Sequence, residues 1–297
     1  MRPCFTWNIG RRSLELGRRT LVMGVVNVTP DSFSDAGLHF EPGAAVEHGI
    51  RLLDEGADIL DIGGESTRPG AHAGEEPAVS AEEELRRILP VIAGVKRVRP
   101  EAVISIDTYK AAVAREAVKW GAEIVNDISG FGWDPEMART VAELGCGVVL
   151  LHTRGRPQEW RTLPPLEDVV GTVKRDLAAI AERAMSAGVA REKIVLDPGF
   201  GFGKNFEQNH PLLARFAEFQ ELGFPLLAGV SRKSFIRKLT ARPGSLPEPA
   251  QRVAGSVAAA VICVLGGAHI VRVHDVAETV QAVAVADAVL AEPCDSA

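Results

Sequence analysis

Short apolar segments alternate with longer amphipathic segments along most of the chain. The apolar segments are of strand length, and they are Leu21–Val26, Ile59–Ile62, Val103–Ile106, Ile124–Val125, Val148–Leu151, Ile194–Leu196, Leu226–Ala228 and Ile270–Val273. Between them, apolar residues recur at helical spacing in Ala44–Glu55, Ala81–Lys96, Ala111–Trp120, Pro135–Leu144, Val169–Ala187 and Pro211–Leu222. This alternation predicts strand–helix units on a parallel sheet. About eight units favour a closed (β/α)₈ TIM barrel, an α/β fold, and a doubly wound open sheet is the alternative.

The segments outside this pattern are short. Residues 1–19 carry weak alternation over Phe5–Arg19 with turn signals between, which predicts an N-terminal β-hairpin. Three polar stretches rich in Gly and Pro are expected to be loops: Thr29–Glu41, Glu65–Val79 and Ala241–Pro249. The first two are long enough to move, and residues 291–297 are expected to form a loose tail. No change in composition divides residues 1–297, so we expect a single domain.

Composition and charge restrict the kinds of partner. The 297 residues carry a formal net charge of −6, which argues against general binding to nucleic acid or to an acidic membrane surface. The four cysteines are scattered and have no zinc-type spacing, which favours a reduced, cytoplasmic setting. The most apolar later run, Val257–Ala268, is too short to cross a bilayer. An anionic ligand would therefore need a local group of cations.

Polar residues follow nearly every predicted strand. They are Asn27, Asp61, Asp107, Asn126, Asp127, His152, Asp197, the turn from Ser231 to Ser234, Arg272 and His274. Any one of them alone could cap a helix or a turn. Because the active site of a (β/α)₈ barrel lies at the carboxyl ends of its strands, we expect many of them to share one site.

The chemistry of these residues suggests a heterocycle that carries an anionic leaving group. Two carboxylates, Asp107 and Asp197, together with the amide of Asn126, suit a ring edge rich in N–H donors, such as a pterin or guanine. The cations suit a phosphate or pyrophosphate, and they are Arg68, Lys233, Arg272 and His274.

The stretch Leu226–Ile236 reads as a strand, a basic turn and the start of a helix, with Ser231 or Ser234 as a possible helix cap. Arg232 and Lys233 at a helix N-terminus oppose the helix dipole, which favours an anion site over a merely solvated basic turn.

Two other features resemble known sites without matching them. The glycine-rich stretch from Gly199 to Lys204 lacks the spacing of a phosphate-binding loop. Lys233 could be a Schiff-base lysine, but its place past a strand end favours contact with a ligand.

Seven ordered motifs together resemble the dihydropteroate synthases, the folate-pathway enzymes that sulfonamides inhibit. They begin at Asn27 (Asn-Val-Thr-Pro-Asp-Ser-Phe-Ser-Asp), Asp61 (Asp-Ile-Gly-Gly-Glu-Ser-Thr-Arg-Pro-Gly), Ser105 (Ser-Ile-Asp-Thr), Asn126 (Asn-Asp-Ile), Asp197 (Asp-Pro-Gly-Phe-Gly-Phe-Gly-Lys), Ser231 (Ser-Arg-Lys-Ser) and Arg272 (Arg-Val-His-Asp). The resemblance runs from about Leu21 to Asp275 and implies a (β/α)₈ barrel.

The resemblance also implies a reaction. 6-Hydroxymethyl-7,8-dihydropterin pyrophosphate and p-aminobenzoate give 7,8-dihydropteroate and pyrophosphate, with Mg²⁺ as the cofactor. The bond to pyrophosphate breaks first, and the aniline nitrogen then attacks a pterin cation. The family further implies a homodimer, for which the apolar segment Val253–Leu265 is either a contact surface or a helix buried in its own domain.

Roles for individual residues follow from the resemblance, motif by motif. Asp107, Asp197, Lys233 and Asp35 are implied to be catalytic. The pterin would be held by Asp107, Asn126, Asp197, Lys233, Arg272 and Thr67. The pyrophosphate would be held by Asn27, Arg68, Arg272 and His274, with Asn27 also the metal ligand. The p-aminobenzoate would be held by Phe33, Thr67, Pro69 and Ser234.

The chain departs from the family pattern at one point. Members commonly have Met-His-Met after the fifth strand, where this chain has Leu151-His152-Thr153, which alters a position near the pterin ring. The segment Ser66–Gly70 shows no insertion of the kind associated with sulfonamide resistance, so sulfonamides are expected inhibitors.

Two other functions fit part of the pattern. A pterin-binding methyltransferase shares the barrel and the carboxylates but has no use for the turn from Ser231 to Ser234. A non-catalytic, pterin-binding paralogue would be expected to lose that turn or parts of the two long loops, which this chain keeps.

Overall fold

The computed structural model describes residues 2–29, 42–66, 73, 79–242 and 245–292. Within this part of the chain, eight parallel strands form one sheet in the order β8-β7-β6-β5-β4-β3-β10-β9. They are β3 (Leu21–Asn27), β4 (Ile59–Gly63), β5 (Val103–Asp107), β6 (Ile124–Asp127), β7 (Gly147–Leu151), β8 (Ile194–Asp197), β9 (Leu227–Ala228) and β10 (Ile270–Val273). One parallel bridge between Leu196 and Leu226 joins the two ends of the sheet. The predicted (β/α)₈ barrel is confirmed, and the open sheet is excluded.

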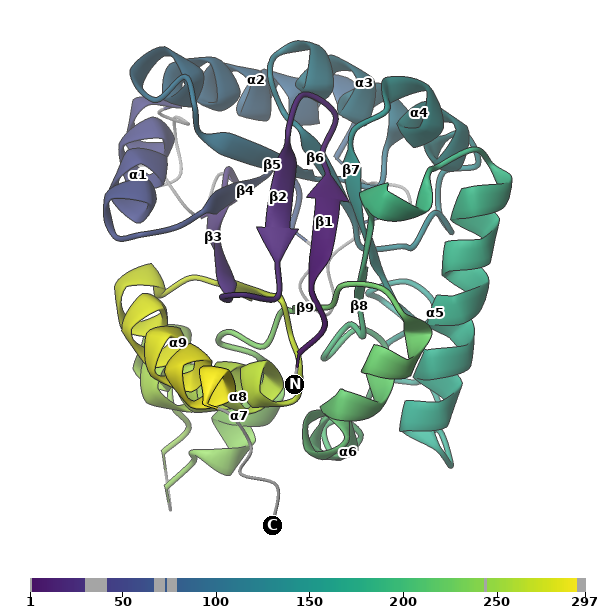
Figure 1. The fold of residues 1–297 in the computed structure, drawn as a ribbon, viewed down its shortest axis with the longest axis vertical. Helices are drawn as coiled ribbons and strands as arrows, with labels where there is room; N and C mark the ends of the chain where they lie inside the picture. Colours follow the sequence, from purple (N-terminus) through teal and green to yellow (C-terminus); the bar gives the residue numbers. More distant parts are fainter. Residues whose placement is uncertain (1, 30–41, 67–72, 74–78, 243–244, 293–297) are drawn as a thin grey trace.

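Helices form a ring around this barrel (Figure 1). They are α1 (Pro42–Asp54), α2 (Ala81–Val98), α3 (Ala111–Lys119), α4 (Met137–Leu144), α5 (Val169–Ser186), α6 (Asn209–Ala214), α7 (Ser234–Leu239), α8 (Val253–Leu265) and α9 (Val276–Ala291). Short 3₁₀ turns add η1 (Arg191–Lys193), η2 (Phe216–Leu222) and η3 (Pro249–Arg252). The single helix predicted over Pro211–Leu222 is wrong, because the chain breaks at Arg215 and continues as η2. There the buried Phe216 and Phe219 lie three residues apart, which suits a 3₁₀ turn.

Alternation along the strands divides the interior of the barrel from its outer wall. In β4, Leu60 and Ile62 pack outward in the core under the helices, whereas Ile59 packs inside the barrel. Because side chains alternate between the faces of a strand, Asp61 points to the inside with Ile59. The interior is thus apolar where the strands begin and polar where they end.

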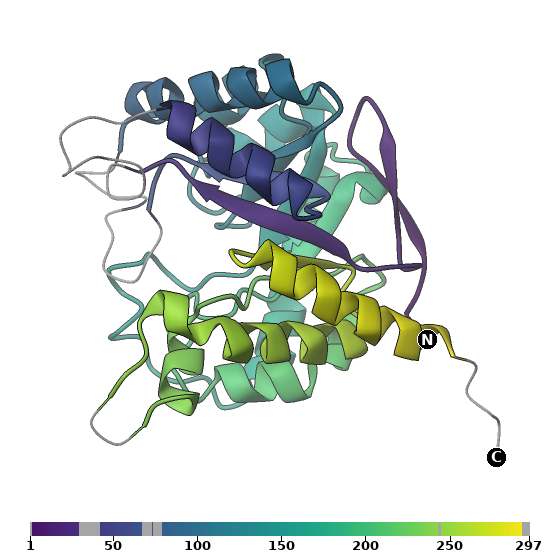
Figure 2. The ribbon, with the colours of Figure 1, turned by 90° about the vertical axis from the view of Figure 1, so that its left-hand side faces the viewer.

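The predicted N-terminal hairpin is confirmed, and it packs against the apolar end of the barrel. Strands β1 (Phe5–Asn8) and β2 (Ser13–Leu16) pair antiparallel. Trp7, Ile9 and Leu16 are buried against the first inward residues of the barrel strands. Figure 2 shows the hairpin beside the end from which β3 starts. The hairpin closes the barrel at that end. The opposite end, where the carboxyl ends of the strands lie, remains available for an active site.

Polar contacts tie this N-terminal segment to distant parts of the chain. The indole N–H of Trp7 donates to the carbonyl oxygen of Lys193 at 2.8 Å. The Arg2 guanidinium donates to the carbonyl oxygen of Ala268 at 2.8 Å and to the Asp287 carboxylate at 2.9 Å. The segment is therefore held by residues that come late in the sequence.

Candidate active site

A cavity opens at the carboxyl ends of the strands, where the polar residues were expected to meet. It is lined by Asp107, Asn126, Ile128, Leu151, Asp197, Phe202, Gly229, Ser231, Lys233, Arg272 and His274. Its free volume is about 50 Å³, well below the roughly 300 Å³ at which ligand pockets begin.

The floor of the cavity is a network of charged and polar groups. The Arg272 Nε donates to Asp61 Oδ2 at 2.6 Å, and its Nη2 donates to Asp107 Oδ2 at 2.7 Å. The Asn126 amide donates to the same Asp61 oxygen at 2.9 Å. Burial raises the pKa of Asp107 to about 7, although Arg272 acts in the opposite direction. Burial alone would lower the pKa of Arg272, but Asp61 and Asp107 outweigh it and raise that pKa.

Asp197 lies on the wall of the cavity at the end of β8. Its side chain is 2% exposed, and its Oδ1 accepts a hydrogen bond from the backbone N–H of Gly199 at 2.7 Å. Burial raises the pKa of this carboxyl group, and the Gly199 hydrogen bond counteracts the rise. Together with Asp107 and Asn126, this arrangement places three hydrogen-bonding groups around one cavity, as the sequence predicted.

The glycine-rich stretch after Asp197 is a tight loop and not a phosphate-binding loop. Gly199, Gly201 and Gly203 all have positive φ, and a Cβ on Gly199 would meet the carbonyl oxygen of His152. The Lys204 ammonium is buried and donates to three carbonyl oxygens, those of His152, Gly199 and Phe202, at 2.8–3.1 Å. Lys204 therefore fixes the loop that carries Phe202 into the cavity.

Lys233 is the cation of the basic turn that reaches the cavity. Its Nζ lies 4.0 Å from the centre of the Phe202 ring, within the range of a cation–π contact. Burial lowers the pKa of this ammonium to about 7, and Asp197 acts in the opposite direction. The Phe202 ring and the negative charge of Asp197 both favour the protonated form of Lys233, whereas burial disfavours it.

The neighbouring Arg232 has a structural task. Its backbone is left-handed, with φ of 58°, and its guanidinium donates two hydrogen bonds to Asp275 at 3.0 and 2.5 Å. Ser231 Oγ lies 3.0 Å from His274 Nδ1, so these two cavity residues orient each other. The prediction that Ser231 or Ser234 caps the helix is wrong, since the N-cap of α7 is Lys233 and no side chain caps it.

Two polar residues at strand ends point away from the cavity. Asp127 follows the inward Asn126 by one position, and its carboxylate accepts hydrogen bonds from Ser129 and Phe131 in the next turn. His152 follows the inward Leu151, and its Nε2 lies 2.9 Å from Asp176 on α5. Burial lowers the pKa of His152 to about 4. The alternative that some strand-end residues are structural is confirmed for both.

Other predicted residues lie near the cavity or outside the described residues. Asn27 ends β3 and Ser234 begins α7, both at the same end of the barrel, but neither lines the cavity. Thr153 is not a lining residue either, whereas Leu151 is. The predictions for Phe33, Asp35, Thr67, Arg68 and Pro69 lie outside the residues that the structure describes.

Sequence reasoning missed three residues that shape the site. Asp61 was recognised as a strand-end residue but was given no role, although it holds two residues of the cavity floor. Phe202 and Leu151 supply apolar walls. The inward position of Asp61 and Leu151 on their strands was a usable signal, but nothing in the sequence placed Phe202 beneath Lys233.

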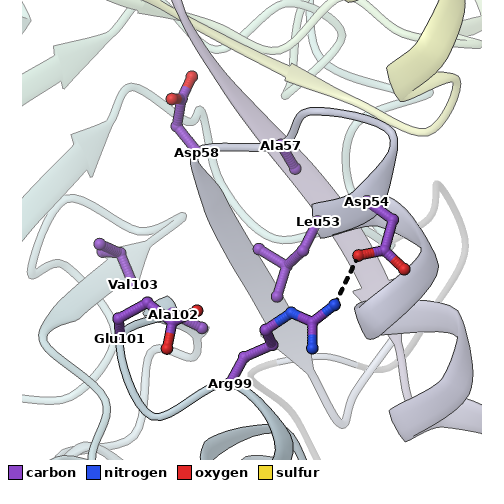
Figure 3. Close-up of a pocket in the computed structure, with 8 residues that line it drawn as sticks. All are labelled: Leu53, Asp54, Ala57, Asp58, Arg99, Glu101, Ala102 and Val103. Atoms are coloured by element: carbon purple, nitrogen blue, oxygen red, sulfur yellow. Dashed lines mark hydrogen bonds and ion pairs between the residues drawn. The ribbon is translucent and has the colours of Figure 1, made fainter.

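A second hollow, of about 270 Å³, lies where the strands begin, and Figure 3 shows its lining. Three of its four charged side chains have partners: Arg99 donates to Asp54 at 2.8 Å, and Asp58 accepts from Arg19. Paired charges of this kind are typical of a solvated surface. We therefore expect the active site in the cavity at the carboxyl ends of the strands.

Comparison with known proteins agrees with this geometry. A family model described as "Pterin binding enzyme" matches residues 23–274. A dihydropteroate synthase of Escherichia coli (strain K12) is 48% identical over 269 residues, covering 91% of each chain. The structure of Xanthomonas albilineans dihydropteroate synthase with 4-aminobenzoic acid is 47% identical, with a TM-score of 0.88 over 98% of this chain and 100% of that one. A Yersinia pestis dihydropteroate synthase in complex with a sulfonamide drug is 44% identical, with a TM-score of 0.83 over 93% and 96%.

Proposed function

The chain belongs to the pterin binding enzyme family, and we propose that it is a dihydropteroate synthase. In this reaction 6-hydroxymethyl-7,8-dihydropterin pyrophosphate is the donor and p-aminobenzoate the acceptor, so the enzyme is a transferase. The proposal rests on one observation. Asp107, Asn126 and Asp197 line one cavity, and Lys233 and Arg272 line the same cavity.

The three acceptors account for recognition of the pterin. Its amino group and ring N–H groups form an edge of parallel donors, and ionised carboxylates accept such hydrogen bonds strongly. We propose that Asp107 and Asp197 accept from this edge and that Asn126 adds a neutral acceptor. The apolar walls, Leu151 and Phe202, suit the ring faces. Lys233 would contact the ring, and Arg272 would stack on it.

The cations account for departure of the pyrophosphate. When the C–O bond breaks, its electron pair leaves with the pyrophosphate oxygen, which gains negative charge. Arg272 and His274 would stabilise that charge, together with Arg68 as the family motif implies. The remaining pterin cation lies beside Asp107 and Asp197, whose ionised forms stabilise it until the aniline nitrogen attacks. The attacking nitrogen then loses a proton to water, which leaves the neutral dihydropteroate nitrogen. We assign Asp35 a catalytic part only through the family motif.

Mg²⁺ is the proposed cofactor. Mg²⁺ usually binds one or two protein oxygens and completes its shell with water and substrate phosphates, so a single protein ligand is compatible with it. Asn27 can supply that ligand. It is the last residue of β3, and its side chain is hydrogen-bonded to none of the described residues. The described residues include no cluster of three His, Cys, Asp or Glu side chains that could hold a metal alone. When bound, the ion would neutralise charge on the pyrophosphate, and Asn27 would hold it toward the substrate.

The p-aminobenzoate would bind above the pterin, between Ser234 and the residues Phe33, Thr67 and Pro69 that the family motifs assign. Ser234 is exposed at the first turn of α7, one residue after Lys233, where a carboxylate can reach backbone N–H groups. Sulfonamides resemble p-aminobenzoate in shape, and a sulfonamide occupies a related structure. We propose that they inhibit this enzyme by competing for the same place.

We also propose that the enzyme is a homodimer in the cytoplasm. α8 and α9 pack side by side, and they expose Ile262, Leu265, Val285 and Val289, whose side chains are 47–68% exposed. Such a group of aliphatic side chains is more typical of an interface than of a solvated surface. The three described cysteines are free, in keeping with a reducing compartment. None of the described helices is long and apolar enough to span a membrane.

The test is release of pyrophosphate by the purified protein with pterin pyrophosphate and Mg²⁺, measured with and without p-aminobenzoate. We expect release that depends on p-aminobenzoate and an equal amount of dihydropteroate, identified by mass spectrometry. Tight pterin binding without release would instead indicate a non-catalytic paralogue. Methyl transfer from methyltetrahydrofolate to a corrinoid, in place of release, would indicate the methyltransferase.

A further inference from the structure

Asp61 is a buried carboxylate that contacts two residues of the cavity floor without lining the cavity itself. It is fully buried in the middle of β4, where its side chain points into the barrel. Burying a carboxylate is costly unless the group is paired and hydrogen-bonded. The partners of Asp61 are Arg272 and Asn126, and both lie in the cavity lining. Its contacts are therefore directed at the residues that meet the substrate.

The first of these contacts determines the orientation of the Asn126 amide. An amide presents a donor on one side and an acceptor on the other, and exchanging the two reverses what a ligand meets. An ionised carboxylate only accepts hydrogen bonds, so Asn126 must turn its Nδ2 toward Asp61, at 2.9 Å. The Asn126 Oδ1 is then left buried and without a hydrogen-bond partner among the described residues. Such an atom is an acceptor held ready for a donor.

The second contact anchors Arg272 at the Asp61 end of its guanidinium. Its Nε bonds Asp61 at 2.6 Å, whereas its Nη2 bonds Asp107 at 2.7 Å. Asp107 is the carboxylate that we assign to a donor-rich ring edge, so Arg272 would share Asp107 with that edge when the ring binds. Asp61 is fully buried, whereas the Asp107 side chain is 12% exposed. The buried partner keeps Arg272 at the cavity floor while the other partner changes.

We propose that Asp61 is a positioning residue for recognition of the pterin: it fixes the acceptor side of Asn126 toward the ring edge and holds Arg272 while Asp107 binds the ring. This inference rests on the proposed function, because it assigns the ring to the same cavity. It adds a residue that does not line the cavity: both of its contacts use Oδ2, and its buried Oδ1 has no hydrogen-bond partner among the described residues. A purely structural role for the Asp61–Arg272 ion pair is the competing explanation.

The experiment compares Asp61→Asn with Asp58→Asn. Both changes remove one carboxylate that is paired with an arginine, and Asp58 lies just before the start of the same strand, paired with Arg19 at the opposite end of the barrel. Binding of 6-hydroxymethylpterin is measured by calorimetry, and KM is measured for each substrate. We expect Asp61→Asn to weaken pterin binding by at least about tenfold. The KM for p-aminobenzoate should change by less than about twofold, and Asp58→Asn should change neither quantity by more than that.

A second background separates positioning from mere stability. In Asn126→Ala there is no amide to orient and only the contact with Arg272 remains, so Asp61→Asn should weaken pterin binding there by a clearly smaller factor than in the parent. Equal losses in both backgrounds would show that Asp61 does not orient Asn126 and would overturn the inference, as would an Asp61→Asn protein that binds the pterin like the parent. If Asp61→Asn fails to fold, the exchange Asp61→Asn with Asn126→Asp restores the hydrogen bond with an acceptor at 126, and it should bind the pterin within about tenfold of the parent. Failure of that folded double variant to bind would count against the inference.

A parent protein that does not bind the pterin at all refutes the proposed function before any variant is compared.

Discussion

Burial moves the pKa values of two cavity side chains, Asp107 and Lys233, toward each other. The pKa of Asp107 rises to about 7 and that of Lys233 falls to about 7, because each charged form loses hydration inside the barrel. In the proposed function, the substrate needs Asp107 as a carboxylate and Lys233 as an ammonium. Both forms are present together only in a narrow range of pH, so the two residues limit activity from opposite sides.

We therefore predict a bell-shaped dependence of kcat/KM on pH, with a maximum near neutrality. Below about pH 7, protonation of Asp107 removes an acceptor from the ring edge; above about pH 7, loss of the Lys233 proton removes a cation. The profile is measured with the free enzyme at low pterin concentration between about pH 5 and 9. A variant, Lys233→Arg, stays charged throughout and should lose the alkaline limb but keep the acid limb. A parent profile that is flat across this range would contradict the assignment.

At the scale of elements, the loop after β8 is stabilised by a cation of the protein itself. The buried Lys204 ammonium holds three carbonyl oxygens together across residues 152–202. Burial lowers the pKa of this lysine well below its usual value, so the contacts with carbonyl oxygens are needed to keep the group inside. The loop in turn supplies Phe202 and the N–H that bonds Asp197.

Replacement of Lys204 should therefore cost stability and disturb the cavity. We expect Lys204→Met to lower the free energy of unfolding by about 2–5 kcal/mol, because buried carbonyl oxygens lose their donor. Urea denaturation measures the loss. The control is Lys238→Met on α7, whose lysine is exposed and stacks over Phe206; it should cost less than about 1 kcal/mol. If both variants unfold at the same urea concentration, Lys204 does not have this role.

The strands were predictable from the sequence because each is a run of apolar residues too short for a helix. The side chains that face the cavity were less predictable. Asp127 and His152 follow inward-facing residues by one position and therefore face outward, a distinction that strand alternation alone could have made. Positions that depend on loops were beyond sequence reasoning. The split of the helix predicted over Pro211–Leu222 depends on packing of Phe216 and Phe219, and the placement of Phe202 depends on three left-handed glycines.

For the whole molecule, the apolar surface of α8 and α9 is the feature that bears on assembly. If it is the surface of a homodimer, one buried charge should disrupt it. We expect Val285→Glu to raise the dimer dissociation constant by at least about tenfold in sedimentation velocity. The matched control is Val98→Glu, which changes another exposed valine at the end of α2, a helix that lies apart from α8 and α9 in Figure 1. A parent protein that sediments as a monomer at all concentrations would refute the homodimer.

The contacts of the N-terminal segment have a consequence for how the protein is made. Arg2 and Trp7 are synthesised long before the residues that they bind, which are Lys193, Ala268 and Asp287. Until those residues emerge, β1 and β2 can pack on the first barrel strands but lack the hydrogen bonds that hold the N-terminal segment in place. The full set of these hydrogen bonds can therefore form only after translation has passed residue 287.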